Sequence, residues 1–128
     1  MAMGLQKTVA GAVRWDWPAS LDALVAAAEY HTLLMENEFV RVVQTRIPPG
    51  ETVPVHTHRW PFVAFIESWS DIVRRDPQGK VTLDTRESAP PKLNAPVWDG
   101  PLLPHSVENV GVVELKIVQV EMKGLPGF

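Results

Sequence analysis

The pattern of hydrophobic residues changes once along the chain, close to residue 31. Before that point, the stretch "PASLDALVAAAEYH" carries an apolar stripe at helical spacing, formed by Leu21, Leu24, Val25 and Ala28. Ser20 is a suitable N-cap for this segment, and Asp22 lies in the first turn, where the helix dipole favours a negative charge. The pattern predicts one short helix near the N-terminus.

From residue 38 onward the chain consists of short runs rich in β-branched and aromatic residues, separated by Gly/Pro turns. The runs are "EFVRVVQTRI", "FVAFIESW", "DIVRRD", "KVTLDTR", "VWDGPLLP", "HSVEN" and "VVELKIVQVEM". Strands at a spacing of roughly 8–12 residues favour an antiparallel sandwich or barrel over βαβ units. The sequence therefore predicts an all-β protein of one domain, with a tail and helix at 1–31 and the β-rich part at 32–128.

Composition narrows the classes of function. The 128-residue chain has a net charge of −3 and no basic cluster, which argues against nucleic acid as a partner. It has no cysteine, which excludes disulfides and thiolate chemistry. No apolar run approaches the roughly 18–20 residues of a membrane span, so no membrane partner is expected. The N-terminus lacks the continuous apolar segment of a secretory signal, and the cytoplasm is the expected location.

The segment "GETVPVHTHRWPF" holds the candidate chemistry. His56 and His58 are two residues apart and project from the same face of a strand, so both imidazoles can converge on one point. A third histidine, His105, opens "HSVEN" after a proline-rich turn. Neutral imidazole suits Zn, Fe, Cu or Ni, whereas carboxylates favour Mn or harder ions. Alternatively, the histidines fill the core and are satisfied by hydrogen bonds.

Two motifs with defined spacing favour a metal site over histidines that only fill the core. Gly50 is followed after five residues by His56-x-His58, and His105 is followed after three residues by Asn109. Over residues 32–122 this pattern resembles the cupin superfamily, and in particular short bacterial cupins, some labelled with β-alanine degradation. The resemblance implies a cupin-type jelly-roll β-barrel of about six to eight strands. It further implies a metal ion held in the barrel mouth by His56, His58 and His105, and a homodimer.

One residue of the cupin pattern is missing. Where the family has a glutamate, this chain has Phe62 or Val63, and Glu67 has the wrong offset to replace it. The expected site is therefore a neutral set of three histidines with open coordination positions. The expected cofactor is a divalent transition metal among Fe, Zn, Ni and Mn, with Fe or Zn favoured. The fourth histidine, His31, is assigned to a helix C-terminal cation or a surface position.

Further residues are candidates for the pocket. On "VRVVQTRI", Gln44 and Arg46 share one face and could contact substrate, with Arg46 able to bind a carboxylate bidentately; a solvated strand position is the alternative that we favour for Arg46. Trp60 and Trp98 are candidate stacking walls, although packing in the core or at a dimer interface is the more common role of such residues. Asn109 is assigned to a turn or to the orientation of His105.

Three functions remain open at this point. The first is a metal-dependent, dioxygenase-like oxidoreductase that acts on a small polar metabolite, since similar three-histidine iron sites occur in some dioxygenases of the superfamily. The second is a non-catalytic protein that binds a metal or another small-molecule ligand. The third is a barrel whose histidines bind no metal.

Overall fold

The computed structural model describes residues 6–7 and 13–124 of the chain. Its helical elements are a 3-10 helix η1 (Ala19–Leu21) and a short helix α1 (Ala23–Ala26). Its strands are β1 (Gln6–Lys7), β2 (Val13–Arg14), β3 (His31–Glu36), β4 (Val40–Ile47), β5 (Thr52–His58), β6 (Phe62–Ser68), β7 (Ile72–Arg75), β8 (Val81–Asp84), β9 (Pro96–Asp99), β10 (Leu102–Asn109) and β11 (Leu115–Met122).

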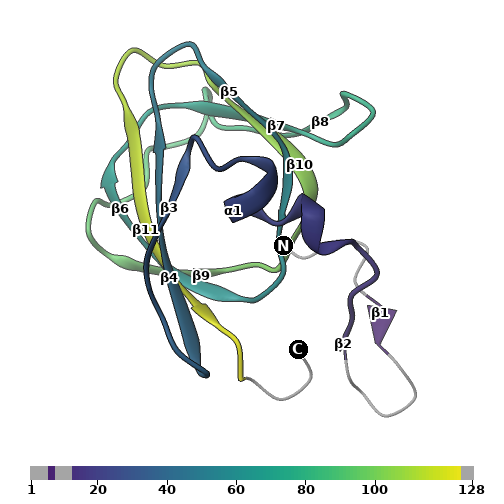
Figure 1. Cartoon of the computed structure of the whole chain (residues 1–128). Coiled ribbons are helices and arrows are strands. Elements are labelled where there is room, and N and C mark those ends of the chain that lie inside the picture. The colour runs from purple at the N-terminus through teal and green to yellow at the C-terminus, as the bar shows by residue number, and fades with distance from the viewer. Residues whose placement is uncertain (1–5, 8–12, 125–128) are drawn as a thin grey trace.

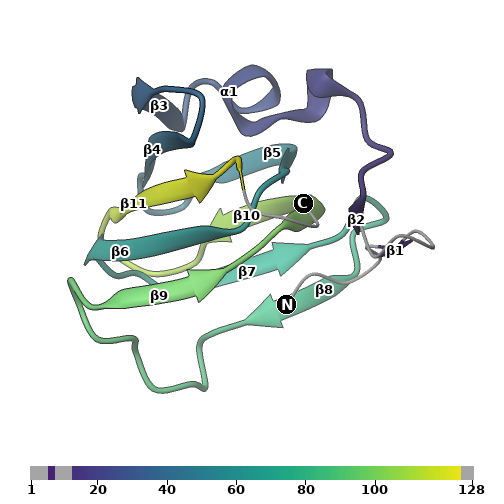
Figure 2. The ribbon, with the colours of Figure 1, turned by 90° about the horizontal axis from the view of Figure 1, so that it is seen from below.

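Two facing antiparallel sheets form the body of the protein. One has the strand order β3-β4-β11-β6-β9, and the other has the order β5-β10-β7-β8; β1 and β2 form a separate pair. Figure 1 shows the two sheets on opposite sides of an interior, and Figure 2 shows the same layers from below. The all-β prediction is confirmed. The described strands form two sheets of a jelly roll and not a hydrogen-bonded closed barrel, and they exceed the expected six to eight.

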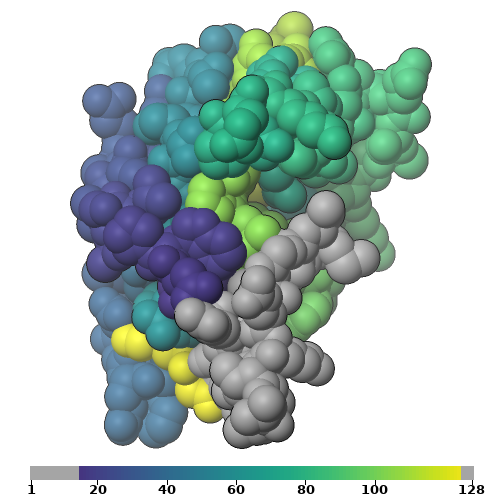
Figure 3. Space-filling model, turned by 90° about the vertical axis from the view of Figure 1, so that its right-hand side faces the viewer, coloured from purple at the N-terminus to yellow at the C-terminus, as the bar shows by residue number. Residues whose placement is uncertain are grey.

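The helix is shorter than the sequence pattern predicts. Asp22, not Ser20, is its N-cap, and the Asp22 carboxylate accepts a hydrogen bond from the Leu24 amide at 3.0 Å. The buried helical face consists of Ala23 and Ala27, whereas Val25 of the predicted stripe is exposed. Small residues suit this position because α1 packs closely against β3 and β5, one strand from each sheet. Figure 3 shows this N-terminal segment, in purple, lying along the strands.

The interior face of β4 is the opposite of the predicted one. Arg41, Val43, Thr45 and Ile47 are buried, and Arg46 is exposed. The pairing of β4 with β11 explains which face is buried, because Thr45 lies opposite Ile117, whereas Arg46 lies opposite Lys116. The sequence-based prediction placed Gln44 and Arg46 inside because a polar interior was expected. The buried face of β4 does carry polar groups, but they are Arg41, which pairs with the buried Glu121, and Thr45.

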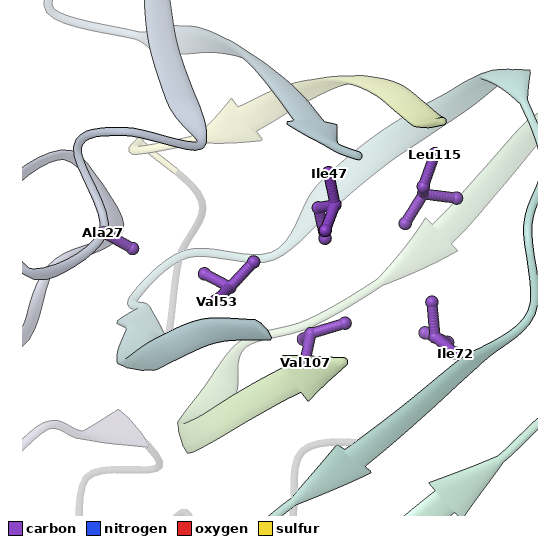
Figure 4. Packing of buried hydrophobic residues seen from close by; sticks show 6 residues of the cluster. All are labelled: Ala27, Ile47, Val53, Ile72, Val107 and Leu115. Carbon is purple, nitrogen blue, oxygen red and sulfur yellow. The ribbon is translucent and has the colours of Figure 1, made fainter. Parts of the chain in front are cut away.

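A hydrophobic cluster holds the sheets together below the histidines. Its buried members come from the C-cap of α1 and from strands of both sheets: Ala27, Ile47, Val53, Ile72, Val107 and Leu115. Figure 4 shows these side chains pointing toward one another between the strands. A second buried group is formed by Phe62, Ala64 and Leu102. Within the part of the chain that the structure describes, no helix is long and apolar enough to cross a membrane.

Candidate metal centre

Four buried histidines meet inside the sandwich. We call His31, His56, His58 and His105 the histidine cluster; these are all the histidines of the chain. The rings of His56 and His58 are 5.0 Å apart between centroids, as expected for residues on one face of β5. His105 lies directly opposite His56 in the β5–β10 register, and their rings are 4.4 Å apart. The structure therefore brings together the three histidines that the sequence pointed to.

Irregularities in the strands orient two of these rings. The β5–β10 register shifts on both sides of the His105–His56 pair, so each histidine follows a local bulge. Each ring then reaches a carbonyl two residues upstream on its own strand: His56 Nδ1 lies 2.7 Å from Pro54 O, and His105 Nδ1 lies 2.6 Å from Leu103 O. Because a carbonyl only accepts, each Nδ1 carries the proton and each Nε2 keeps a free lone pair.

His31 belongs to the cluster, and its assignment to the surface or to a helix terminus as a cation was wrong. It is the first residue of β3, is 5% exposed, and its ring lies 4.9 Å from that of His56 and 5.4 Å from that of His58. Its Nδ1 donates to Ala27 O at 2.9 Å. That carbonyl belongs to the C-cap residue of α1, where backbone acceptors lack partners within the helix. The helix thus orients His31.

The donor set fits a transition metal. One ring nitrogen each from His31, His56 and His58 lies within 4.8 Å of the others, and this buried group could hold a metal ion. Metal-bound histidines commonly donate their other N–H to a carbonyl or carboxylate, which is what His31, His56 and His105 do here. Neutral imidazoles suit Zn, Fe, Cu or Ni.

Burial keeps the cluster neutral at physiological pH. Removal from water lowers the pKa of His105 to about 4, and the nearby Arg74 guanidinium acts in the same direction. Burial likewise lowers the pKa of His31 and holds those of His56 and His58 well below their ordinary range. Protonation of one ring also disfavours protonation of its neighbours. Unprotonated rings are the form that binds a metal, so no proton competes for the lone pairs at neutral pH.

A buried chain of charges adjoins the cluster. We call Asp22, Arg41 and Glu121 the ion chain. Arg41 Nε donates to Glu121 Oε1 at 2.6 Å, and the two Nη atoms of Arg41 donate to the two Asp22 oxygens at 2.9 and 3.0 Å. Burial alone would lower the pKa of Arg41, but the hydrogen bonds with Asp22 and Glu121 outweigh it and raise the pKa. Glu121 is fully buried, so its charge is compensated within the protein.

Gln119 joins the ion chain to the cluster. Its Nε2 donates to Glu121 Oε2 at 2.8 Å and to His58 Nδ1 at 3.1 Å. His58 therefore differs from the other three rings, because its Nδ1 accepts and its proton sits on Nε2. Glu121 Oε2 lies 3.5 Å from the same Nδ1. When Nε2 serves as a ligand, the proton moves to Nδ1 and faces this carboxylate, an arrangement that raises ligand basicity. Gln119 Nε2 can then no longer donate to Nδ1 and keeps its hydrogen bond with Glu121 Oε2.

The cluster opens into an interior cavity of about 190 Å³. The wall is mostly apolar, with Ile66, Leu115 and Ile117 among its residues. Besides the four histidines and Gln119, the polar groups of the wall are Thr45, Arg74 and Asp99. An apolar cavity with a few convergent polar groups is typical of a small-molecule site.

The predicted substrate contacts on β4 lie outside this cavity. Arg46 is exposed and pairs with Glu114 at 3.0 Å. Gln44 donates to Glu67 at 3.2 Å on the same outer face. The inward placement of Gln44 and Arg46 was wrong, while the favoured alternative of a solvated strand position describes Arg46. Glu67 lies far from the histidines' face, in line with its exclusion as a ligand.

The predicted tryptophans also lie elsewhere. Trp98 is 57% exposed on β9, the edge strand of its sheet, and does not line the cavity. Trp60 packs against Arg41, whose guanidinium carbon is 5.0 Å from the ring centroid, on the far side of the ion chain. The aromatic residues that line the cavity are instead Phe62 and Trp69. Aromatic residues therefore do line the cavity, but they are not the two tryptophans that the sequence analysis named.

Asn109 does not orient His105. Its Nδ2 donates to Ile47 O and Val113 O, both at 2.9 Å, and its Oδ1 accepts from Ser70 Oγ at 2.7 Å and Gly111 N at 3.0 Å. The side chain is thus fully used in tying the β10–β11 turn to neighbouring segments. His105 relies on its own strand's carbonyl.

Phe62 lies beside the histidine cluster, where a carboxylate was expected. It is buried, and its ring centroid lies 6.0 Å from that of His58. Gly100 allows this ring to approach, because a Cβ there would lie 2.7 Å from Phe62 Cε2, and its φ of +79° also favours glycine. The chain thus supplies a fourth imidazole, His31, and the carboxylate beside the rings is that of Glu121, whose Oε2 lies 3.5 Å from His58 Nδ1.

Solved structures share this architecture. A cupin domain from Bordetella pertussis Tohama I matches with a TM-score of 0.58 and 22% identity over 73% of this chain and 92% of its own. An RmlC-like cupin family protein with a double-stranded β-helix fold from Methanocaldococcus jannaschii matches with a TM-score of 0.51 and 15% identity, over 76% and 79% of the two chains. The chain has the cupin fold. A protein with a double-stranded β-helix domain from Klebsiella pneumoniae subsp. pneumoniae MGH 78578 also matches this chain, with a TM-score of 0.51, 19% identity and coverage of 76% and 78%.

At these identities the likeness of this chain to other proteins concerns the fold. No protein-family model matches the sequence, and no curated protein matches it. The resemblance to short cupins labelled with β-alanine degradation stays a prediction, as do the homodimer, the location in the cytoplasm and the division into residues 1–31 and 32–128.

Sequence signals for the missed residues exist in part. Pro54 precedes His56 by two residues and Pro104 precedes His105 by one; proline inside a strand marks a bulge, and bulges here orient both rings. For His31, the strand "HTLLME" begins at the histidine itself, which separates it from the helix. No local sequence pattern predicts that Arg41 and Glu121 pair, because 79 residues lie between them.

Proposed function

We propose that this cupin binds a divalent transition metal through His31, His56 and His58, with His105 as a further imidazole at the same centre. The observation that carries the proposal is the convergence of buried, neutral rings whose Nδ1 atoms are held by protein groups. Three of the four imidazoles carry their proton on Nδ1, so their Nε2 lone pairs are available to a metal ion.

The protein's own groups prepare this centre. Ala27, Pro54 and Leu103 carbonyls hold three Nδ1 protons, so those rings present Nε2 without rearrangement. Glu121 can hold the Nδ1 proton of His58, which frees the fourth Nε2. A bound metal ion would supply Lewis-acid or redox chemistry. The apolar cavity wall excludes bulk water and strengthens polar interactions with a small ligand.

We propose further that the protein is an oxidoreductase acting on a small polar metabolite. The support is the neutral donor set, which leaves the charge of the ion uncompensated by ligands, together with a cavity beside it. A non-catalytic binding protein is the second candidate. It is favoured by one observation, namely that the nearest carboxylate, Glu121, is already engaged by Arg41 and Gln119 and is not available as a general base.

The first test is metal binding. Protein purified without a metal-affinity tag, stripped with a chelator, is titrated with Fe²⁺, Zn²⁺, Ni²⁺ and Mn²⁺ by calorimetry. We expect one ion per chain, and we expect His56→Gln and His58→Gln to lose at least about 100-fold in affinity. Glu67→Gln, on the outer face, is the matched control and keeps the parent affinity. A parent that cannot be loaded overturns the proposal.

Two variants decide the composition of the ligand set. If His31 is a ligand, His31→Gln loses as much affinity as His56→Gln. If the set read from the sequence motifs holds instead, His105→Gln shows that loss and His31→Gln does not. Oxygen consumption by the iron-loaded protein with thiols, β-amino acids and diketones then separates enzyme from binder, since a binder consumes no oxygen with any of them.

A further inference from the structure

Arg74 is a half-buried cation whose function the metal centre does not explain. It lies on β7 opposite Val107 of β10, and it lines the histidine cavity. Its Nε is buried and has no hydrogen-bond partner in the structure. A buried donor without an acceptor is unfavourable, so such a group calls for an explanation.

No carboxylate of the described residues forms an ion pair with Arg74, and Asp99 acts on its pKa only through a longer-range charge interaction that opposes the effect of burial. Asp99 also lines the cavity, but its Oδ1 accepts from the Gly100 amide at 2.7 Å, and no ion pair joins it to Arg74. The buried arginine, Arg41, has two carboxylate partners, and the next residue on β7, Arg75, pairs with Glu108 at 2.8 Å. Unlike Arg41 and Arg75, Arg74 thus has no ion-pair partner among the described residues.

Position relates Arg74 to the metal centre. Its neighbour across the ladder, Val107, is two residues from His105 along β10, a distance of about 7 Å along a strand. The two side chains face the same cavity, whose wall between them is apolar. Burial lowers the pKa of Arg74, yet an arginine side chain stays protonated at neutral pH. The cavity therefore has neutral imidazoles at one part of its wall and a positive charge at another.

The chemistry of the two groups defines a ligand. A guanidinium presents parallel N–H donors that match the two oxygens of a carboxylate. The volume of about 190 Å³ restricts the ligand to a small molecule, and the apolar wall favours a short hydrocarbon body. We infer that Arg74 binds the carboxylate of a small organic acid whose other end reaches the histidine cluster. The inference deepens the proposed function by naming the substrate class, although anion binding at Arg74 does not itself require a metal.

The test uses two probes of equal size, butyrate and butyramide, which differ in charge. Binding to the full chain is measured by calorimetry at pH 7.5, on the chelator-treated protein and on the zinc-treated protein. We expect butyrate to bind about 10- to 100-fold more tightly than butyramide, as charge-assisted hydrogen bonds provide. Arg74→Met abolishes this preference, and Arg74→Lys retains only part of it. Arg75→Met, its neighbour on β7, is the matched control and keeps the preference.

Stability provides a second readout. Because Arg74 forms no ion pair with any described residue and its Nε has no hydrogen-bond partner, Arg74→Met is expected to unfold at the same temperature as the parent or a higher one. A lower temperature would assign the guanidinium a structural role and overturn the inference. Equal binding of both probes in both forms of the protein would overturn it as well. If zinc fails to bind but the preference for butyrate persists, the proposed metal function falls and the inference about Arg74 stands.

Discussion

The histidine cluster and the ion chain are both buried and polar, and they touch at Gln119, yet their electrostatics are opposite. In the ion chain, each charge has a partner of the opposite sign at 2.6–3.0 Å. In the histidine cluster, each Nδ1 is engaged by a protein group, while the rings face one another without any opposite charge between them.

This difference separates structural from binding roles. A polar network whose members all satisfy one another gains nothing from a ligand, and removal of one member leaves a buried charge exposed to an apolar environment. In contrast, His31, His56 and His105 carry their protons on Nδ1, so their Nε2 lone pairs remain available to a ligand. The ion chain therefore supports the fold, whereas the histidine cluster, and Arg74 beside it, can bind a ligand.

The largest expected effect comes from breaking the ion chain. Arg41→Met leaves the fully buried Glu121 without its cation, and we expect the free energy of unfolding to fall by about 3–5 kcal/mol. Urea denaturation measures the change. Arg86→Met, which removes an exposed pair with Asp84, is the control and should leave the midpoint unchanged. An Arg41→Met protein as stable as the parent would contradict the role given to the chain.

The next effect concerns pH and the cluster. The pKa of His105 is about 4 in the folded protein against 6.5 ordinarily, so between these values the unfolded chain binds a proton that the folded chain does not. Stability is therefore full above pH 6.5 and declines as the pH falls toward 4, by about 3 kcal/mol for this one ring. Urea unfolding of the metal-free protein at intervals from pH 7.5 to 4.5 measures the decline.

A matched variant assigns this pH dependence. His105→Gln keeps a polar side chain but cannot titrate, so its stability should fall less steeply between pH 6.5 and 4 than that of the parent. The same slope in both proteins would show that other groups, and not His105, carry the effect. Metal affinity should decline over the same range, because a proton and a metal ion compete for Nε2.

A smaller effect is expected where the two regions meet. Gln119→Leu removes the donor to His58 Nδ1 and the contact with Glu121, while the ion pair of Glu121 with Arg41 remains. We expect metal affinity to fall about 10- to 100-fold, as for other residues that orient a metal ligand. Calorimetric titration measures it. Gln44→Leu, on the outer face of β4, serves as the control, and an equal loss there would refute the role of Gln119.

The smallest effect tests which face of β4 is interior. Arg46→Met removes an exposed ion pair with Glu114 and should change neither metal affinity nor the binding of butyrate. Both are measured by the titrations already described. A loss of butyrate binding in Arg46→Met, with Arg74→Met unaffected, would restore the sequence-based assignment of Arg46 as the carboxylate contact.

Local patterns were sufficient for most strands and for the convergence of His56, His58 and His105, but they missed β3 and misplaced the boundary between β9 and β10. Alternation places His56 and His58 on one face whatever the partner strand is, and the proline-rich turn before His105 returns the chain to the same end of the sandwich. The helix was predicted too long because periodicity does not reveal that only Ala23 and Ala27 fit against the sheets.

Tertiary structure decided the rest of the site. Which face of β4 is buried depends on its pairing with β11, and a shift of one residue in register reverses every side chain. His31 joins the cluster because the end of α1 carries its carbonyl to the mouth of the sandwich, and Arg41 is buried because Glu121, far away in sequence, lies beside it. The sequence by itself thus determined that imidazoles would meet between two sheets. Long-range pairing alone determined which further groups, His31, Arg74 and Gln119, would meet them there, because burial and charge compensation depend on neighbours that no local pattern contains.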